Sequence, residues 1–199
     1  MTEPVLLVER RDDVALIGLN RPEKHNALSG ELLRGLTATV RDLGDDAGVR
    51  VVVVRGNDRC FSTGMDLDDL AGLSGIAETQ RALDVFRETN EAIERCPKPV
   101  IAAVAGWCLT GGLELAFACD IRLAADTARF GITSARIGTV AGAGGTQRLP
   151  RLVGAGRAKE LLFSAEPIDA VEAYRIGLVI AFADVRARGG ERRDVPCAP

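Results

Sequence analysis

The chain has 199 residues, enough for one domain with a full-sized core, because a chain of this length buries roughly 70% of the surface that it exposes when unfolded. Apolar residues make up 47% of it and charged residues 27%, which is typical of a globular protein and excludes a fibrous or disordered one. The net charge of -3 lacks the basic excess that would neutralise a nucleic-acid backbone, so no nucleic-acid partner is expected.

The N-terminal sequence and the cysteine and histidine content narrow the class of protein further. MTEPVLLVERRDD has acids and a proline where a signal peptide needs a basic start, and no apolar stretch reaches the roughly 18 residues of a membrane span. We therefore expect a cytoplasmic protein without membrane contact. The five cysteines form no CxxC pair, which favours reduced core thiols over a disulfide framework. His25 is the one histidine, which excludes a zinc site built on several histidines, and no metal is expected.

The first part of the chain predicts a hairpin, a helix and a buried strand. Residues 5–8 and 14–19 are short apolar runs separated by the charged turn ERRDD, as in a β-hairpin. Ser29 is the predicted N-cap of a helix with apolar residues at helical spacing. These apolar residues are Leu32, Leu36, Val40 and Leu43. The run VRVVVVRG predicts a buried strand, since its valines leave no polar face for water.

A second amphipathic helix is predicted over residues 76–95, and CPKP ends it because proline cannot continue a helix. One side of this helix carries Leu83, Phe86, Asn90 and Ile93. PVIAAVAG and CDIRLAA predict strands on either side of the segment GGLELAFA, and helices are predicted near 146–152, 157–163 and 169–176. Strands that alternate with helices without a strict βαβ rhythm favour an α/β or mixed layered fold, with ββα units stacked in succession.

The composition changes at residue 185. The segment VRARGGERRDVPCAP is rich in arginine and glycine and has no apolar period of two or 3.6 residues. A segment of this kind is expected to be a disordered or poorly packed tail. The chain is therefore divided into a core at 1–184 and a tail at 185–199.

Five segments in the same order resemble the crotonase superfamily, in particular the enoyl-CoA hydratase/isomerase family, over about residues 4–179. They are RPEKHNALS, CFSTGMDLDDL, AGWCLTGGLELAFACDIRLAADTARFG, GTVAGAGGTQRLPRLVG and EAYRIGLV. The resemblance implies an α/β fold, the crotonase (ClpP-like) spiral of repeated ββα units. It also implies an acyl-CoA enzyme that forms trimers or hexamers, with coenzyme A as part of the substrate and no separate cofactor. The family's C-terminal helical region is largely missing after GLV, so a truncated or divergent member is expected.

Two backbone amides, those of Met65 and Gly111, are the catalytic donors that the resemblance implies. Gly64 gives the FSTGMD loop the freedom to turn its N–H groups outward. Gly111 opens a helix, where amides lack internal partners and the helix dipole favours negative charge. Together they would form an oxyanion hole, in which loss of one donor typically costs ~100 to 1000-fold in rate. The alternative is that both glycine loops are only tight turns.

Glu114 is the predicted acid/base. It lies in an apolar segment, and burial raises the pKa of a carboxyl toward the range useful for proton transfer. It matches one catalytic glutamate of the family's hydratases; alternatively, it is a buried carboxylate satisfied by a backbone or arginine partner. The second glutamate, in the pattern FGxPE, matches Ser134, which follows Thr133 instead of proline. A single carboxylate suits double-bond isomerisation better than hydration, although the motifs as a whole look more like those of a hydratase.

The resemblance places coenzyme A along two loops, at 24–27 and 65–68. The residues assigned to substrate binding are Lys24, His25, Ala27, Gly64, Met65, Asp66, Leu67, Asp68 and Gly111. Lys24 either meets a phosphate or is a solvated surface charge, and the acids after Met65 either approach the acyl chain or cap the next helix. GTVAGAGGTQ is not a dinucleotide fingerprint and the chain has no GK dipeptide, so nucleotide chemistry is not expected.

Three functions remain open at this point. The first is an enoyl-CoA hydratase/isomerase reaction with Glu114 as acid/base. The second is another crotonase-type reaction, decarboxylation or C–C cleavage, at the same oxyanion hole. The third is a truncated homologue that binds acyl-CoA with weak activity or none.

Overall fold

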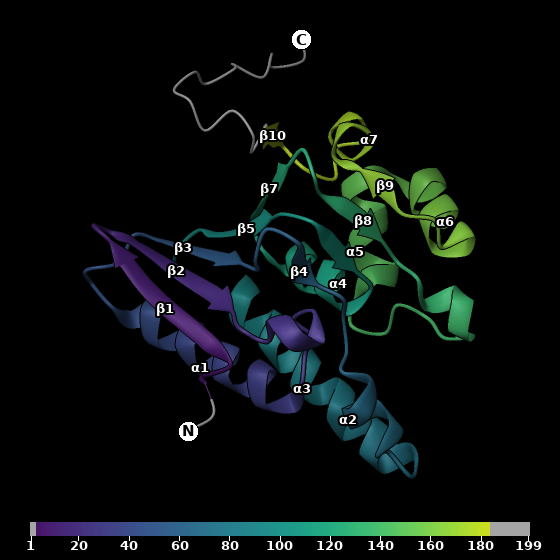
Figure 1. Cartoon of the computed structure of the whole chain (residues 1–199), viewed down its shortest axis with the longest axis horizontal. Coiled ribbons are helices and arrows are strands. Elements are labelled where there is room, and N and C mark those ends of the chain that lie inside the picture. Colours follow the sequence, from purple (N-terminus) through teal and green to yellow (C-terminus); the bar gives the residue numbers. More distant parts are fainter. Residues whose placement is uncertain (1–2, 184–199) are drawn as a thin grey trace.

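The structure is a computed structural model that describes residues 3–183 of the chain. Within this part, strands form a six-stranded sheet in the order β1-β2-β3-β5-β7-β10 and a four-stranded sheet in the order β4-β6-β8-β9. Figure 1 shows α1 and α3 along one face of the large sheet, with the later helices gathered at the far end of the molecule. The predicted tail at 185–199 and the domain boundary at 184 lie outside the described residues.

The elements have the following bounds. The strands of the large sheet are β1 (Leu6–Arg11), β2 (Val14–Leu19), β3 (Val51–Arg55), β5 (Val100–Val104), β7 (Ile121–Ala125) and β10 (Ala181–Ala183). Those of the small sheet are β4 (Cys60–Ser62), β6 (Trp107–Leu109), β8 (Arg129–Gly131) and β9 (Ile168–Asp169). The helices are α1 (Gly30–Asp45), α2 (Leu67–Ala71), α3 (Ile76–Glu94), α4 (Gly111–Ala118), α5 (Gly145–Val153), α6 (Ala155–Ser164) and α7 (Ala170–Arg175). Two short 3-10 turns are η1 (Pro22–Lys24) and η2 (Ser134–Ile137).

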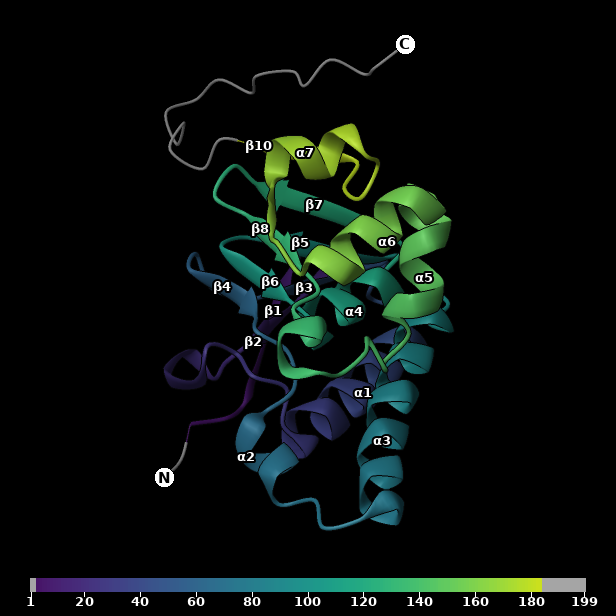
Figure 2. The ribbon, with the colours of Figure 1, turned by 90° about the vertical axis from the view of Figure 1, so that its right-hand side faces the viewer.

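The two sheets are linked by a repeated unit. Strands β3, β5 and β7 are parallel neighbours in the large sheet, and the strand that follows each of them, β4, β6 and β8, lies parallel to its counterparts in the small sheet. A helix completes each unit, and Figure 2 shows these units stacked along the molecule. This arrangement confirms the predicted spiral of ββα units. The first unit differs, because β1 and β2 form an antiparallel hairpin within the large sheet.

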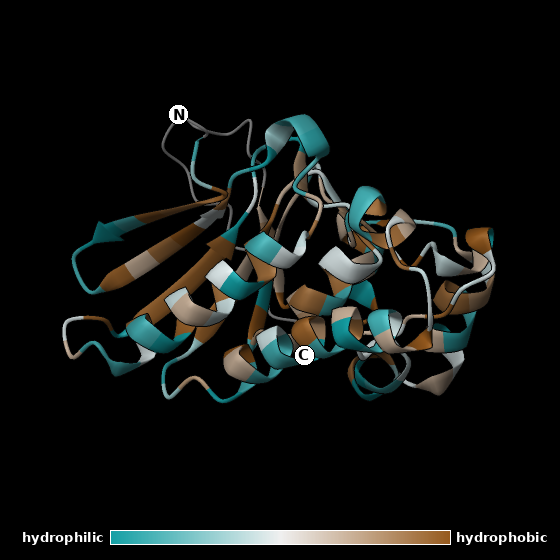
Figure 3. Ribbon diagram, turned by 90° about the horizontal axis from the view of Figure 1, so that it is seen from below, coloured by the Kyte–Doolittle hydropathy of each residue, from teal (hydrophilic) through white to brown (hydrophobic). Residues whose placement is uncertain are grey.

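Helix α1 begins where the sequence predicted. The Ser29 side chain accepts a hydrogen bond of 3.3 Å from the Leu32 N–H, which satisfies one of the free donors of the first turn. The predicted apolar side faces inward, and its residues are Leu32, Leu36, Val40 and Leu43. In Figure 3 the strands of the large sheet are largely hydrophobic, whereas the helices below them carry hydrophilic residues toward the viewer.

Helix α3 packs against α1 and corrects one detail of the prediction. Phe86, Asn90 and Ile93 are buried, as their spacing predicted, but Leu83 is 37% exposed. The first turns of α3 project beyond the core, so Ile76 is also exposed. A helical period identifies the inward side of a helix, but it does not show where along the helix the neighbouring elements end.

Two glycines permit the close contact between the units. A Cβ atom at Gly112 would lie 2.4 Å from the Ser62 carbonyl oxygen, so α4 rests directly on the backbone of β4. A Cβ atom at Gly106 would lie 1.9 Å from the Arg59 carbonyl oxygen. Any larger residue at these positions forces the backbone to shift. Of the helices formed by residues 3–183, none has the length and apolar character needed to cross a membrane.

We expect Gly112→Ala to lower the free energy of unfolding by about 1–3 kcal/mol, because the added methyl overlaps the Ser62 carbonyl and forces α4 away from β4. Urea denaturation measures the change. Gly156→Ala in α6 is the matched control, since a Cβ atom there meets nothing within 4 Å. A Gly112→Ala protein as stable as the control would show that α4 does not need this contact.

Candidate active site

The segments that follow β4 and β6 meet because these short strands lie side by side and parallel. The first segment contains Gly64 and Met65, and the second contains Thr110 and Gly111. An atom at the Cβ position of Gly111 would lie 3.2 Å from the Met65 nitrogen, and one at the Cβ position of Gly64 would lie 2.9 Å from the Gly111 nitrogen. The fold therefore brings the two predicted amides close together.

Neither amide is used by the described part of the protein. Among residues 3–183, the N–H groups of Met65 and Gly111 donate no hydrogen bond, whereas those of Gly64, Asp66 and Thr110 are paired. The Gly64 carbonyl accepts from Leu28 at 2.7 Å, and the Asp66 N–H donates to the Leu28 carbonyl at 3.2 Å. Buried backbone N–H groups are nearly always paired. Two free donors at one place therefore form a site that suits an incoming acceptor.

Thr110 holds the start of α4 in a conformation that a β-branched residue rarely adopts, with φ 45° and ψ -115°. Three bonds hold it. Its N–H donates to the Gly131 carbonyl at 2.8 Å, its Oγ1 lies 2.8 Å from the Thr133 Oγ1, and the same Oγ1 accepts from the Thr133 N–H at 3.2 Å. Ser134, the next residue, is 4% exposed and begins η2. The segment that carries Ser134 is thus tied to the start of α4.

Glu114 lies one turn beyond Gly111 in a helix that is buried throughout. Its side chain is 3% exposed, and its Oε1 accepts a 2.8 Å hydrogen bond from the Gly145 N–H. Burial raises the pKa of Glu114 to about 7, although the amides of Gly145 and Ala143 and the charge of Arg148 act to lower it. Both forms of the carboxyl are therefore present near neutral pH, which suits a group that takes and returns a proton.

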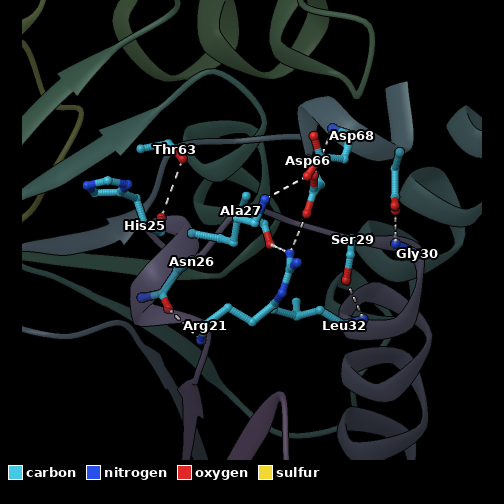
Figure 4. Close-up of polar contacts among 12 residues, drawn as sticks. Arg21, His25, Asn26, Ala27, Ser29, Gly30, Leu32, Thr63, Asp66 and Asp68 are labelled. Atoms are coloured by element: carbon cyan, nitrogen blue, oxygen red, sulfur yellow. Dashed lines mark hydrogen bonds and ion pairs between the residues drawn. The ribbon is translucent and has the colours of Figure 1, made fainter. Parts of the chain in front are cut away.

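The two loops assigned to coenzyme A are joined to each other (Figure 4). Arg21 donates to the Asp66 carboxylate at 2.7 Å and to the Ala27 carbonyl at 2.6 Å, and Lys24 donates to the Asp68 carboxylate at 2.6 Å. Asp66 is 4% exposed and caps α2 by accepting from the Asp68 N–H. Burial acts to raise the pKa of Asp66, but the bonds from Arg21 and from the Asp68 amide outweigh it and lower the pKa. Asp66 is therefore a structural link between the loops.

Other predicted residues of these loops face outward. His25 and Lys24 are exposed, and Leu67, at the start of α2, is 68% exposed. Asp69, which was a candidate cap or acyl contact, accepts from the Gly30 N–H at 2.8 Å and so connects α2 to the start of α1. The structure thus brings together the backbone of both loops, while several of the predicted side chains point away from it.

Sequence reasoning missed a cavity of about 690 Å³ beside Met65. Leu28 and Met65 line it on the side of the free amides, and residues of α1, α2 and α3 complete it, among them Leu33, Leu70 and Val85. Of the residues predicted for the site or as possible acyl contacts, Met65, Asp68 and Asp69 line it. No motif marks the rest of the lining, because it comes from single positions on three helices that are distant in sequence.

The four cysteines within residues 3–183 are free, as predicted, and Cys197 lies outside this part. Burial raises the pKa of Cys60 to about 11 and that of Cys119 to about 12, so both stay protonated thiols at neutral pH. In the same part of the chain, no group of three or more His, Cys, Asp or Glu residues is arranged to hold a metal ion.

The class that this architecture defines is the crotonase spiral. The structure matches the crystal structure of an enoyl-CoA hydratase from Bacillus anthracis with a TM-score of 0.88 and 40% identity, covering 92% of this chain and 71% of that one. A family model described as enoyl-CoA hydratase/isomerase matches residues 9–187. The chain therefore belongs to the enoyl-CoA hydratase/isomerase family, and it is an acyl-CoA enzyme of the hydratase/isomerase type.

Two further relatives have names that state a hydratase activity. The chain is 42% identical over 175 residues to a crotonyl-CoA hydratase of Syntrophomonas wolfei, which covers 87% of this chain and 67% of that protein. It is 40% identical over 178 residues to a short-chain-enoyl-CoA hydratase of Clostridium acetobutylicum, with the same two coverages of 87% and 67%. The chain thus spans about two thirds of the length of these relatives.

The raised pKa of Glu114 predicts that the protein becomes less stable as the pH rises. The carboxyl ordinarily titrates near 4.5 and in the folded protein near 7, so between these values only the folded state holds the proton. The contribution of Glu114 is fully present below pH 4.5 and is lost as the pH rises through 7, a total of about 3 kcal/mol. Urea denaturation of the wild type and Glu114→Gln across this range measures it. Equal pH dependence of the two proteins would contradict the prediction.

Proposed function

We propose that the chain binds an acyl-CoA thioester and stabilises its enolate with the amides of Met65 and Gly111. The observation that carries this proposal is the pair of free, neighbouring N–H groups within the described part of the chain. The thioester oxygen becomes negative when a proton leaves the α-carbon, and donors that are already in place then stabilise it without having to reorganise. Gly111 adds the favourable end of the α4 dipole.

Glu114 is the acid/base of the proposed reaction. Its carboxylate takes a proton from C2 of a 3-enoyl thioester, and the electron pair of that C–H bond moves into the enolate. The protonated Glu114 then returns the proton to C4, which gives the 2-enoyl thioester. A pKa of about 7 suits both steps, because the group gives up and accepts a proton with similar ease at neutral pH.

Hydration of a 2-enoyl thioester is the second candidate, and the names of the hydratase relatives favour it. It requires a group that activates water as well as one that handles the α-carbon proton. Ser134 occupies the position of the second glutamate in the family's hydratases, and an unassisted serine hydroxyl is a weak base at neutral pH. Isomerisation therefore fits this chain better than efficient hydration does.

Coenzyme A is proposed to lie along the backbone of the loops at 24–27 and 65–68, with the acyl group in the cavity beside Met65. Lys24 is exposed, and its pair with Asp68 can exchange for a phosphate at little cost, since surface ion pairs contribute little. Family membership supports a homo-oligomer, a trimer or hexamer. Exposed apolar residues on the late helices, such as Phe163 and Val171, are consistent with an interface.

Glu114→Gln is expected to lower kcat for a 3-enoyl-CoA ester by about 100 to 10,000-fold, because the amide keeps the shape of the side chain but cannot carry the proton. KM should change little, since the oxyanion donors remain. Glu88→Gln is the control, a change at an exposed residue of α3 whose ion pair is with Arg41. An unchanged rate in Glu114→Gln would remove Glu114 from the mechanism.

Ser134→Glu is expected to raise hydration of a 2-enoyl-CoA ester by at least about 100-fold, since it supplies the carboxylate that orients and deprotonates water. A coupled assay for the 3-hydroxyacyl product measures this rate beside the rate of isomerisation. If wild type and variant hydrate equally fast, the missing carboxylate is not what limits hydration. Turnover of malonyl-type or β-hydroxy thioesters alone would favour decarboxylation or C–C cleavage instead.

A further inference from the structure

Asn90 is a fully buried amide on the inner side of α3, and its partner lies in the segment that precedes α5. Its Nδ2 donates a 2.9 Å hydrogen bond to the Ala143 carbonyl. Arg148 of α5 donates to the same carbonyl at 3.0 Å. One turn before Asn90, the ring of Phe86 lies against Gly111, since a Cβ atom there would be 3.2 Å from the ring. This side of α3 therefore faces the candidate active site.

The segment that Asn90 holds is the one that contacts Glu114. The Gly145 N–H donates to the Glu114 carboxylate at 2.8 Å, and the Ala143 amide also stabilises the charged form. The Ala143 carbonyl belongs to the Ala143–Gly144 peptide plane, which lies between the two planes that carry the Ala143 and Gly145 N–H groups, so holding it limits how far either N–H group can turn. Asn90 and Glu114, from two different helices, thus contact the same three-residue segment, Asn90 at the Ala143 carbonyl and Glu114 at the Gly145 N–H.

The burial of Asn90 lowers the stability of the folded protein. Its Oδ1 is buried and, within residues 3–183, has no hydrogen-bond partner. A buried acceptor without a donor loses its hydrogen bonds to water and forms none in the protein. An apolar residue of similar size at this position would therefore give a more stable protein. Residues that lower stability in this way are typical of functional sites. The cost indicates that the Nδ2 bond serves a purpose other than stability.

We propose that Asn90 is a positioning residue that holds the Ala143–Gly145 segment so that its amides face the Glu114 carboxylate during proton transfer. This inference rests on the proposed role of Glu114 as the acid/base. Without the bond from Asn90, the Ala143 carbonyl keeps only its bond from Arg148, and the amides of the segment move away from the carboxylate. Because these amides favour the charged form, the pKa of Glu114 then rises.

The charge of the neighbouring groups does not account for the rise in the Glu114 pKa that is expected when Asn90 is replaced. Arg148 is the charged neighbour from α5, and its Nε is paired with Glu94 of α3 at 2.7 Å. Asn90 carries no charge, so its replacement by an apolar residue changes the pKa of Glu114 through the position of the amides and not through a lost charge.

The test is Asn90→Leu, with Asn90→Ala as a second variant should leucine prevent folding. The carboxyl of Glu114 is titrated by ¹³C NMR, with its signal assigned by its loss in Glu114→Gln, and kcat/KM for a 3-enoyl-CoA ester is measured against pH. We expect the pKa to rise by up to about one unit, with kcat/KM on the acidic limb about tenfold lower and the high-pH plateau nearly kept. The stability of Asn90→Leu should equal or exceed that of the wild type.

Thr89→Val is the matched control, because Thr89 is buried on the same helix and bonds to Thr37 and to the backbone of Leu33 and Val85. It should leave both the NMR pKa and the pH profile unchanged. An unchanged Glu114 pKa in the Asn90 variants, or the same shift in Thr89→Val, overturns the inference. An NMR shift without a matching shift in kcat/KM would instead contradict the role of Glu114 as acid/base and leave Asn90 as a positioning residue for its carboxyl.

Discussion

The parallel alignment of β4 and β6 is the constraint on which the candidate site depends. Each strand has only three residues, yet the two lie side by side, so the segments that leave them must meet. Gly112 makes the contact possible, because its missing side chain lets α4 lie on the backbone of Ser62. The free amides of Met65 and Gly111 are neighbours for this reason, and the buried position of Glu114 one turn later has the same cause. The site is a product of backbone packing more than of side-chain arrangement.

The larger elements could be predicted from the sequence because each carries a complete local signal. Ser29 and the apolar residues after it predicted α1 and its N-cap, and the valines at 51–54 predicted β3. The small sheet could not be predicted in this way, since β4, β6, β8 and β9 have two or three residues each and show no period. Their partners are set by the contact between units, which periodicity does not contain. The same limit applies to Leu83, which the spacing puts on the same side of α3 as the buried residues but which is 37% exposed, because spacing alone does not show where α3 leaves its neighbours.

The sequence allowed a similar part of the candidate site to be predicted. The glycine-bearing segments and Glu114 were assigned through the family resemblance that their motifs carry, and burial raises the pKa of Glu114 as expected. The roles of Arg21 and Asn90 were not foreseen. Arg21 joins two loops 45 residues apart, and Asn90 holds a carbonyl 53 residues away. Contacts of this range leave no mark in a single sequence, and an asparagine within an apolar period looks like an ordinary helix position.

The conformation of Thr110 links two parts of the molecule mechanically. A β-branched residue stores energy at a positive φ, and here the hydroxyl pair with Thr133 balances that energy. Thr110 is bonded to the chain at 131–134 and directly precedes Gly111. Any displacement of that chain therefore also moves the Gly111 amide. A substitution that removes the Thr133 hydroxyl would therefore alter the hydrogen-bond donor at Gly111 without contacting it.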